Sequence, residues 1–436
     1  MSYRETLDYF YRQLPMFHRI GPAAYKNDLT NTLALCGSLG NPQDKFPTVH
    51  VAGTNGKGSV SHLLAAVCQA AGLKTGLYIS PHYLDFRERI KVNGQYIPRR
   101  RVVDFVGRHR AIIEDVQPSF FELCVAMAFD HFARERVDIA IIEVGLGGRL
   151  DSTNVITPLL SVITNISYDH QNLLGNTLPL IAGEKAGIIK PGVPVVIGET
   201  QPAVASVFLE RAAANGSSIV FADQHFTALE KMGDPWSPTV YDVLRDDQSY
   251  LKNLEVDAAG PFQAKNVVTT LQALEMLNGM RNAEYGMRNA PLLPSIRAGF
   301  GRLRTLTRFL GRWQIIGQQP TVLCDSAHNE AGLRLAFEKI GTLPFHRLHI
   351  VTGFVNDKSV EDVLGLFPTT AQYYFAKADI PRGLDAGLLR EQAAVFHLHG
   401  RAYTSVRRAL AAARRRAMPE DLVVVIGSIF VVAEVL

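Results

Sequence analysis

Short apolar runs alternate with longer segments of helical periodicity along most of the chain. The apolar runs are bounded by glycine and proline and are nearly continuous, which is typical of strands covered by helices on both faces. They predict strands at 48–52, 75–79, 138–144, 160–164 and 193–197. Between them, residues 60–71 and 121–134 are predicted to be helical. This alternation indicates a parallel α/β sheet.

A second group of strands follows a weaker region. The pattern becomes polar over 221–260, which predicts a small β excursion or a long surface insertion, and a helix is expected at 261–280. Two prolines, several glycines and little periodicity place the domain linker at 282–301. Strand signals then return at 321–324, 348–351, 372–375 and 422–426. We therefore expect a larger α/β domain over 1–300 and a smaller, Rossmann-like α/β domain over 301–436.

Composition narrows the class of protein. With 47% hydrophobic and 20% charged residues, the chain is not disordered, collagen-like or a coiled coil. The net charge of +4 is too small to indicate nucleic acid as a partner, and the triplet 414–416 of arginines is interpreted as a solvated helix face. Four scattered cysteines in apolar surroundings favour buried free thiols in a reducing compartment. No signal-peptide or membrane-spanning pattern is recognisable, so we expect a cytoplasmic monomer without a membrane partner.

The strongest local motif follows the first predicted strand. It reads Gly53-Thr54-Asn55-Gly56-Lys57-Gly58-Ser59 and precedes a predicted helix. Glycines let backbone N–H groups cradle phosphate oxygens, and a helix N-terminus adds positive potential. Lys57 is then expected to reach the terminal phosphates, and Ser59 to cap the helix or approach a magnesium ion. The alternative, a glycine-rich turn with an exposed lysine, explains less of the motif, so the first domain is predicted to be a P-loop-containing, parallel-sheet ATPase domain.

Taken with later motifs, this loop resembles that of the folylpolyglutamate synthase/dihydrofolate synthase family in the Mur ligase superfamily. Further blocks resemble the family in the same order along nearly the whole chain. They are Ser80-Pro-His82, 86–90, 143–151, Thr153-Asn154, Thr164-Asn165, Asp169-His170, 184–190, Gln263, Asn266, Gly311-Arg312 and 325–329. The resemblance implies a Mur ligase-like central domain over 1–300 and a glutamate ligase domain over 301–436, with ATP and Mg²⁺ as cofactors.

The implied reaction joins a carboxylate of dihydropteroate or a reduced folate to the amine of L-glutamate. A carboxylate is a poor acylating agent because its leaving group is an oxide. Phosphorylation by ATP gives an acyl phosphate with a good leaving group, which the amine then attacks. The protein must hold ATP, neutralise the transferring phosphoryl group and keep water away from the acyl phosphate. Small-molecule substrates are thus the expected partners.

Three residues are candidates for a metal site. Glu143 ends a predicted strand, where open α/β sheets bind their ligands, and its carboxylate suits magnesium. The resemblance adds Ser80 and His170 around the metal and makes Lys57, Glu143, His170 and Lys185 the catalytic set. It also implies that Lys185 is carbamylated, which turns a cation into an anion. The alternative for Lys185 is a plain salt bridge to Glu184 or to a neighbour.

The remaining candidates concern the acyl substrate and the nucleotide. The resemblance places the pterin-side contacts at Ser119, Phe120, Phe121, Glu122, Leu150, Asp151 and Ser152. The two phenylalanines can stack on a flat ring, although aromatic residues at a helix start more often belong to the core. For the nucleotide, the resemblance implies an adenine-side Asn266, an Arg312 that reaches the phosphates from the second domain, and an Asp325 that contacts the nucleotide.

Two features leave room for other hypotheses. The family pattern usually has glycine and proline where this chain has Ser326 and Glu330, which puts the geometry of that loop in question. The segment 18–29, with Tyr25 and Lys26, has no assigned contact. A murein-precursor ligase of the same superfamily is the alternative enzyme, although such ligases usually carry a different loop ending and an extra N-terminal domain. A nucleotide-driven switch without ligation is the alternative from another class.

Overall fold

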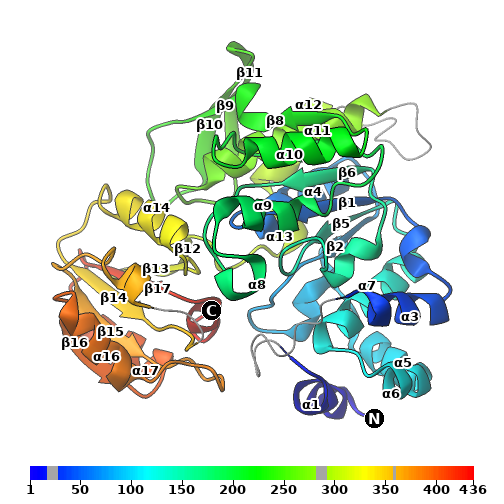
Figure 1. The fold of residues 1–436 in the computed structure, drawn as a ribbon. Coiled ribbons are helices and arrows are strands. Elements are labelled where there is room, and N and C mark those ends of the chain that lie inside the picture. The colour runs from blue at the N-terminus through cyan, green and yellow to red at the C-terminus, as the bar shows by residue number, and fades with distance from the viewer. Residues whose placement is uncertain (17–27, 281–291, 357–359) are drawn as a thin grey trace. The chain divides into compact units, whose positions relative to one another are not determined.

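The computed structural model describes residues 1–16, 28–280, 292–356 and 360–436. The described part splits into two compact units (Figure 1). The larger unit comprises Met1–Met232, Thr239–Asp257 and Gln263–Phe309, and the smaller unit comprises Gly233–Pro238, Ala258–Phe262 and Leu310–Leu436. The change of unit near the predicted boundary therefore falls between Phe309 and Leu310. The segment 18–29 lies outside the described residues except for its last two positions.

The larger unit is built on one mostly parallel sheet. Its described strands follow the spatial order β4-β3-β2-β5-β1-β6-β7-β8. From β2 to β8 all neighbours are parallel, while β3 and β4 pair antiparallel at one edge. The strands are β1 (Thr48–Ala52), β2 (Thr75–Tyr78), β3 (Ile90–Val92), β4 (Gln95–Tyr96), β5 (Ile139–Glu143), β6 (Leu160–Ile163), β7 (Val195–Ile197) and β8 (Ile219–Phe221). The five strands predicted in this region are confirmed.

Helices cover the sheet on both faces. In the larger unit they are α1 (Tyr3–Gln13), α3 (Thr30–Ser38), α4 (Lys57–Ala70), α5 (Arg99–Arg108), α6 (Arg110–Val116), α7 (Phe120–Glu135), α8 (Gln171–Leu174), α9 (Leu178–Ala186), α10 (Ala205–Ala214), α11 (Gln263–Gly279), α12 (Leu292–Gly301) and α13 (Leu303–Thr307). Helix α4 contacts β1, β2 and β5, and α11, α12 and α13 pack on it. Because these neighbours surround α4, residues 59–68 are all buried, including the polar Ser61 and His62.

The region 221–260 forms a small antiparallel sheet, which confirms the predicted β excursion. Its strands are β9 (Phe226–Glu230), β10 (Thr239–Arg245) and β11 (Gln248–Val256), in the order β11-β10-β9. Strand β9 packs on α11, so this sheet belongs to the larger unit apart from the excursion at Gly233–Pro238.

The predicted linker at 282–301 is wrong where it is described. Residues 281–291 lie outside the described part, but Leu292–Gly301 form helix α12. Pro294 lies in the first turn, where the missing N–H has no helical partner to lose. A Cβ on Gly299 would lie 2.7 Å from the Val67 nitrogen, so this glycine allows the backbones of α12 and α4 to approach closely. Glycine marks helix packing here rather than a break between domains.

The smaller unit is a second α/β layer structure. Its described strands follow the order β12-β13-β17-β14-β15-β16, parallel except for β12 at the edge. They are β12 (Gln314–Gly317), β13 (Thr321–Asp325), β14 (Leu348–Thr352), β15 (Gln372–Ala376), β16 (Gly400–Tyr403) and β17 (Leu422–Ile426). The helices are α14 (Glu330–Ile340), α15 (Glu361–Leu364), α16 (Ala386–Val395), α17 (Val406–Arg416) and α18 (Ile429–Ala433). The four strands predicted here are confirmed, as is the α/β class of both parts.

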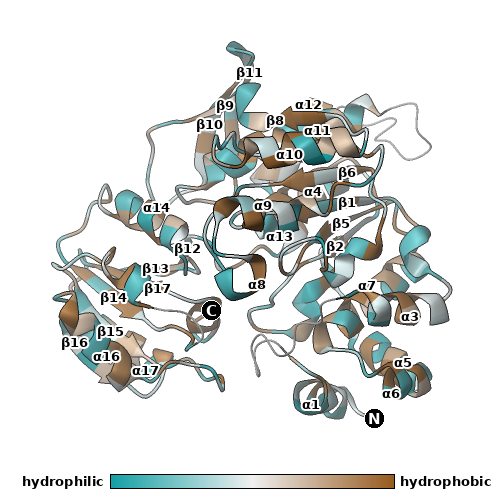
Figure 2. Ribbon diagram, in the orientation of Figure 1, coloured by the Kyte–Doolittle hydropathy of each residue, from teal (hydrophilic) through white to brown (hydrophobic). Residues whose placement is uncertain are grey.

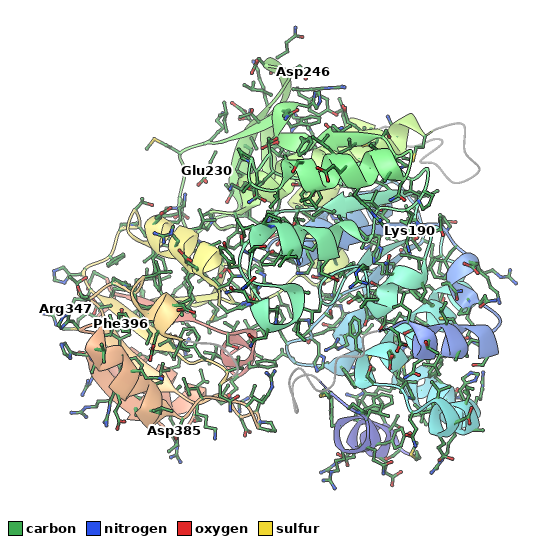
Figure 3. All side chains as sticks on the ribbon, in the orientation of Figure 1. Lys190, Glu230, Asp246, Arg347, Asp385 and Phe396 are labelled. Carbon is green, nitrogen blue, oxygen red and sulfur yellow. The ribbon has the colours of Figure 1, made fainter. Side chains whose placement is uncertain are left out.

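Side-chain burial agrees with this layering. In Figure 2 the outer helices α5 and α17 carry hydrophilic and hydrophobic residues side by side, as expected for helices with one buried face. All four cysteines are buried free thiols, as predicted. Figure 3 shows Asp385 at the start of α16, where its carboxylate caps the helix by accepting from Gly387 N (2.8 Å). Within the described ranges, every helix is too short or too polar to cross a bilayer.

The close approach of α12 and α4 gives a stability prediction. Replacing Gly299 by alanine forces the two helices apart, so we expect a loss of about 1–3 kcal/mol in the free energy of unfolding. Gly107, exposed in α5 with open space around its Cβ position, is the matched control. Gly107→Ala should be neutral or stabilise by up to about 1 kcal/mol. Urea unfolding of both variants measures the difference, and equal effects would contradict the packing argument.

Candidate active site

Four neighbouring strands bring the candidate residues to one edge of the larger sheet. Strands β2, β5, β1 and β6 are parallel and adjacent, so their carboxyl ends lie at the same edge. Ser80 follows β2, Glu143 ends β5, the loop 53–59 follows β1, and the loop that begins at Thr164 and carries His170 follows β6. Such an edge is where open α/β sheets bind ligands.

The phosphate loop is pressed against two neighbours. Gly53 has φ +142° and Gly56 has φ +86°, both in the region that favours glycine. A Cβ on Gly53 would overlap Thr164 Oγ1, and a Cβ on Gly56 would overlap Asn266 Oδ1. Both positions therefore require glycine for conformation and for space.

Hydrogen bonds from the loop after β6 hold the phosphate loop in place. Thr54 N donates to Asn165 O (2.8 Å), and Asn55 N donates to Asn165 Oδ1 (3.1 Å). Ser167 N donates to Thr54 Oγ1 (3.0 Å). Ser167 thus contributes to this contact through its backbone. The loops after β1 and β6 thus form one hydrogen-bonded unit.

Two lysines converge on one carbonyl of the phosphate loop. Lys57 Nζ donates to Gly53 O (3.0 Å) and Thr54 O (3.1 Å), so it lies on the loop itself. Lys185 Nζ, on α9, also donates to Gly53 O (2.9 Å). Lys185 is buried, and burial, followed by the charge of Lys57, lowers the pKa of its amine to about 7.

The alternative of a Lys185–Glu184 salt bridge is wrong. Glu184 Oε1 instead takes a fork of two hydrogen bonds from Arg149, at 3.1 Å from Nε and 2.9 Å from Nη2. Arg149 is therefore tied to α9 through Glu184. Lys185 is left beside the phosphate loop. Among the described residues no carboxylate forms an ion pair with it, although the charges of Asp169 and Asp151 act to raise its pKa.

Glu143 lies between the phosphate loop and Ser80. Its side chain is only 5% exposed, and its Oε2 accepts a hydrogen bond from Ser80 N (3.0 Å). Its Oε1 is 3.5 Å from the position that a Cβ on Gly58 would take, so the carboxylate touches the start of α4. No group of three or more His, Cys, Asp and Glu side chains in the described residues is arranged to hold a metal ion. The geometry thus brings Ser80, through its backbone N–H, next to the Glu143 carboxylate.

His170 lies on the same edge but in a different local setting. Its φ is +50°, and it is the residue that precedes α8. Its backbone N donates to Asp169 Oδ1 (2.9 Å), and its Nε2 lies 3.8 Å from the same oxygen. The loop after β6 therefore presents His170 together with Asp169, a carboxylate to which the sequence assigned no role.

The glycine-rich turn after Glu143 is shaped by Asp151. Asp151 is buried, and its Oδ2 accepts from Gly145 N (3.0 Å) and Leu146 N (2.9 Å). Burial raises the pKa of this carboxyl, against the hydrogen bonds that lower it. Its other oxygen accepts from Thr153 N (3.0 Å). The predicted substrate acceptor is thus engaged within its own turn, followed by a buried Ser152 and preceded by a partly exposed Leu150.

The block 184–190 supports this turn from the other side. Lys190, labelled in Figure 3, donates from Nζ to Asn154 O (2.8 Å). Asn154 Nδ2 donates in turn to Gly187 O (3.1 Å). The segment after the turn is therefore fixed to the end of α9, which carries Lys185.

The adjacent phenylalanines at the start of α7 have different surroundings. Phe120 is 4% exposed and belongs to an aromatic cluster, with ring centroids 5.9 Å from Phe86 and 6.2 Å from Phe10. Phe121 is partly exposed, and its ring tip would overlap a Cβ on Gly145. Phe120 is therefore a core residue, whereas Phe121 lies against the glycine-rich turn.

The other two pterin-side candidates at this position form a helix cap. Ser119 Oγ accepts from Glu122 N (3.2 Å), and Glu122 Oε2 accepts from Ser119 N (2.6 Å). Glu122 Oε2 also accepts from Asn31 Nδ2 (3.3 Å), which joins α3 to α7. This capping box fixes where α7 begins and hence where Phe121 points.

Asn266 lies beside the phosphate loop. It is 3% exposed on the first turn of α11, and its Nδ2 donates to Gln263 Oε1 (3.0 Å). Its Oδ1 faces Gly56, as the space around that glycine shows. The structure thus brings the predicted adenine-side residue to the loop, with Gln263 as the neighbour that orients its amide.

The smaller unit places Asp325 and Arg312 close to each other. Asp325 ends β13, and its two oxygens accept from Trp313 N (2.9 Å) and Ala327 N (2.8 Å). Burial raises the pKa of Asp325, and the charge of Arg312 opposes that shift. Ser326 Oγ donates to Gly311 O (3.2 Å), so this departure from the family pattern adds a bond to the loop.

The second departure, Glu330, also has a local role. It is the first residue of α14, where a negative charge is favoured by the helix dipole, and it pairs with Arg334 at 2.8 Å. Asn329 caps the same helix by accepting from Gly332 N (3.0 Å). The substitution thus exchanges one stabilising feature of a helix start for another.

Comparison with known proteins agrees with this geometry. The family model described as the Mur ligase middle domain matches residues 51–274, and that of the Mur ligase glutamate ligase domain matches residues 311–429. The chain is 33% identical to folylpolyglutamate synthase of Lacticaseibacillus casei over 448 residues, which covers 100% of this chain and 98% of that protein.

Solved structures give the same result. Mycobacterium tuberculosis folylpolyglutamate synthase complexed with ADP is similar with a TM-score of 0.86 at 29% identity, covering 99% of this chain and 97% of that one. Escherichia coli FolC in complex with DHPP and ADP is similar with a TM-score of 0.84 at 28% identity, covering 100% and 97%. The chain therefore belongs to the folylpolyglutamate synthase/dihydrofolate synthase family of ATP-dependent ligases, within the Mur ligase superfamily.

Proposed function

We propose that this protein ligates L-glutamate to dihydropteroate and to reduced folates, with ATP, through an acyl phosphate. The observation that carries the proposal is the convergence of the phosphate loop, Glu143, Ser80 and the His170 loop at the ends of four adjacent strands. The names of the relatives support the choice of substrates, and one similar structure holds DHPP and ADP. These relatives favour a folate ligase over the murein-precursor alternative.

The nucleotide is proposed to bind at the phosphate loop. The backbone N–H groups of Gly56, Gly58 and Ser59, with Lys57 Nζ, would face the phosphates. Thr54 and Asn55, whose N–H groups bind Asn165, would hold the loop in the shape that the nucleotide needs. Asn266, which abuts Gly56, would orient the nucleotide from α11. In the smaller unit, Arg312 supplies a guanidinium for phosphate charge and Asp325 an acceptor, and we assign both to the nucleotide.

The residues fit a magnesium ion. Glu143 supplies a carboxylate, and the hydroxyl of Ser80, whose backbone N–H binds that carboxylate, would be a second oxygen ligand. Mg²⁺ is often held by one or two carboxylates and takes its other ligands from water and phosphates. When bound, this ion neutralises phosphate charge during phosphoryl transfer. We assign Ser80, Glu143 and His170 to this ion. The Lys57 amine would attract the negatively charged phosphates from the side of the loop.

Lys185 is proposed to carry a carbamate. With a pKa lowered to about 7, its amine is substantially neutral near pH 7. A neutral amine nitrogen attacks the carbon of CO₂, forms an N–C bond and releases one proton, which leaves a carbamate anion. In this position the anion would replace the repulsion between Lys185 and Lys57 by attraction.

The acyl substrate is proposed to lie along the glycine-rich turn. Phe121 would stack on the flat ring, with Leu150 and Ser152 flanking it. The turn and the start of α7 would be held in shape by Asp151, Ser119, Phe120 and Glu122.

We further propose that the enzyme works as a cytoplasmic monomer on small molecules, without nucleic acid or membrane. Size-exclusion chromatography tests the monomer, and cell fractionation tests the location.

Glutamate-dependent release of ADP from ATP and Mg²⁺ tests the function. The assay is run separately with dihydropteroate and with tetrahydrofolate. Activity with both supports the proposal in full, and activity with one assigns a single branch of the reaction. If ATP binds but neither substrate gives glutamate-dependent turnover, the folate assignment fails and the murein-ligase and switch hypotheses return.

The carbamate gives a pH-dependent prediction. Below pH 7 the Lys185 amine is protonated and cannot attack CO₂, so ¹³C-bicarbonate labelling and activity should fall as pH drops from about 8 to about 6. ¹³C NMR of the folded enzyme should show a carbamate signal that Lys185→Met lacks. Lys190→Met, which removes a lysine outside the loop, serves as the control. A signal that persists in Lys185→Met would contradict the assignment.

The two phenylalanines give a matched pair of substitutions. Phe121→Leu should raise KM for the pterin substrate about three- to tenfold with little change in Tm, since stacking on a ring contributes about 0.5–1.5 kcal/mol. Phe120→Leu should instead lower the free energy of unfolding by about 1–3 kcal/mol and leave KM nearly unchanged. Steady-state kinetics and thermal unfolding separate the two effects, and the reverse pattern would overturn the proposed stacking role.

A further inference from the structure

The loop that carries Ser80 is held by a buried glutamate. After β2 the chain leaves the sheet over 79–85 and returns through the 3-10 helix η3 (Phe86–Arg89) into β3. Glu88, in η3, is only 3% exposed. Its Oε2 accepts from Tyr83 N (2.7 Å), and its Oε1 accepts from Leu84 N and Asp85 N (2.8 Å each). One carboxylate thus satisfies three successive backbone donors.

The start and the middle of this loop have further fixed contacts. At the start, Ile79 N donates to Arg89 O (3.1 Å), and Ser80 N donates to Glu143 Oε2 (3.0 Å). In the middle, Arg89 Nε donates to His82 Nδ1 (2.8 Å). The loop therefore connects Glu143 on one side with the η3 side chains on the other, and its shape determines where Ser80 lies.

A buried lysine interacts with the charge of Glu88 without a direct bond to it. Lys91, in β3, is 1% exposed, and its Nζ donates to Thr307 O (2.9 Å) at the end of α13. Burial lowers the pKa of Lys91 to about 7, and the charges of Glu88 and then of Glu143 oppose that shift. An ionised carboxylate without a nearby cation or N–H groups would be very costly at this depth. For Glu88 the three backbone N–H groups supply this compensation, and Lys91 acts on it only through its charge.

We propose that Glu88 is a positioning residue that fixes the Ser80 loop against Glu143 and so sets the affinity of the site for its divalent cation. This inference rests on the proposed magnesium-dependent reaction. Glu88 has no contact with the proposed ligands themselves, since its oxygens are directed to the loop backbone. Residues that orient metal ligands in this way typically change metal affinity about 10- to 100-fold when altered.

Glutamine at this position removes one of the hydrogen-bond acceptors that the loop backbone needs. A carboxylate only accepts hydrogen bonds, whereas the amide NH₂ of Gln only donates. In E88Q the amide nitrogen would face at least one of the three backbone N–H groups, two donors would meet, and the loop would shift. Glu88→Asp keeps the charge but is one methylene shorter, so it should reach fewer of the three donors.

Binding of Mn²⁺, followed by EPR with ADP present, tests the proposal without turnover. We expect E88Q to weaken Mn²⁺ affinity at least tenfold, while ADP affinity in the absence of metal changes less than twofold. E143Q, which removes the proposed ligand, gives the reference for loss of the site. In the assay of glutamate-dependent ADP release, the Mg²⁺ concentration for half-maximal rate should rise by a similar factor.

Asp421 in the smaller unit supplies a matched control. It is also 3% exposed, and its carboxylate accepts from Arg347 N (3.0 Å), Met418 N (2.8 Å) and the His349 imidazole. We expect both D421N and E88Q to lower Tm, because each removes a buried acceptor. D421N should leave Mn²⁺ affinity within twofold of the wild-type value. If both variants lose stability and neither changes Mn²⁺ affinity, Glu88 is merely structural and the proposal is overturned.

Two further outcomes differ from a merely structural role of Glu88: misfolding of E88Q and failure of the proposed function. If E88Q does not fold, Glu88→Asp is measured instead, with an expected weakening of about three- to tenfold, and unchanged Mn²⁺ affinity again overturns the proposal. Failure of the proposed function would appear as wild-type enzyme without glutamate-dependent turnover, whereas Mn²⁺ binding would still report the effect of Glu88. Unchanged Mn²⁺ binding in E143Q would overturn the metal site, and the role of Glu88 with it.

Discussion

The backbone of the phosphate loop is pressed between two neighbours that leave no room for side chains at two of its positions. Gly53 abuts Thr164 after β6, and Gly56 abuts Asn266 on α11. These contacts fix three segments that are more than one hundred residues apart in the sequence. Because α4 begins at Lys57, they also fix the direction of a helix whose N-terminus carries a partial positive charge. The placement of Glu143, which touches the first turn of α4, depends on this arrangement.

The same loop concentrates positive charge in a buried place. Lys57 and Lys185 both donate to the Gly53 carbonyl, so the two amines lie near each other. Such a pair is unfavourable when both are protonated, and this contributes to the lowered pKa of Lys185. Binding of an anion, or conversion of Lys185 to an anion, relieves the repulsion. The protein therefore holds at this point an electrostatic strain that a polyphosphate would release.

Much of the fold could be predicted because buried parallel strands give continuous apolar runs, and the loop could be predicted because its glycines have no substitutes. The failures have a common cause in tertiary contacts. Pro294 and Gly299 indicate a linker locally, yet they belong to a helix whose glycine allows contact with Val67. Phe120 and Phe121 are identical residues side by side. Only the position of α7 puts Phe120 in the aromatic core and Phe121 against the turn at Gly145.

Buried carboxylates have roles that the sequence alone does not reveal, and these roles share one physical principle. Each of three buried carboxylates accepts hydrogen bonds from two or more backbone N–H groups near the edge of a sheet. They belong to Asp151, Glu88 and Asp325. Hydrogen bonds to an ionised group contribute about 1.5–3 kcal/mol, enough to hold a loop that has no regular secondary structure. A sequence shows an acidic residue in a motif but not whether its oxygens face a ligand or the backbone. The acidic residues in the motifs of this fold therefore form two groups. Some, such as Glu143, would bind ligands, and the others shape the loops around those ligands.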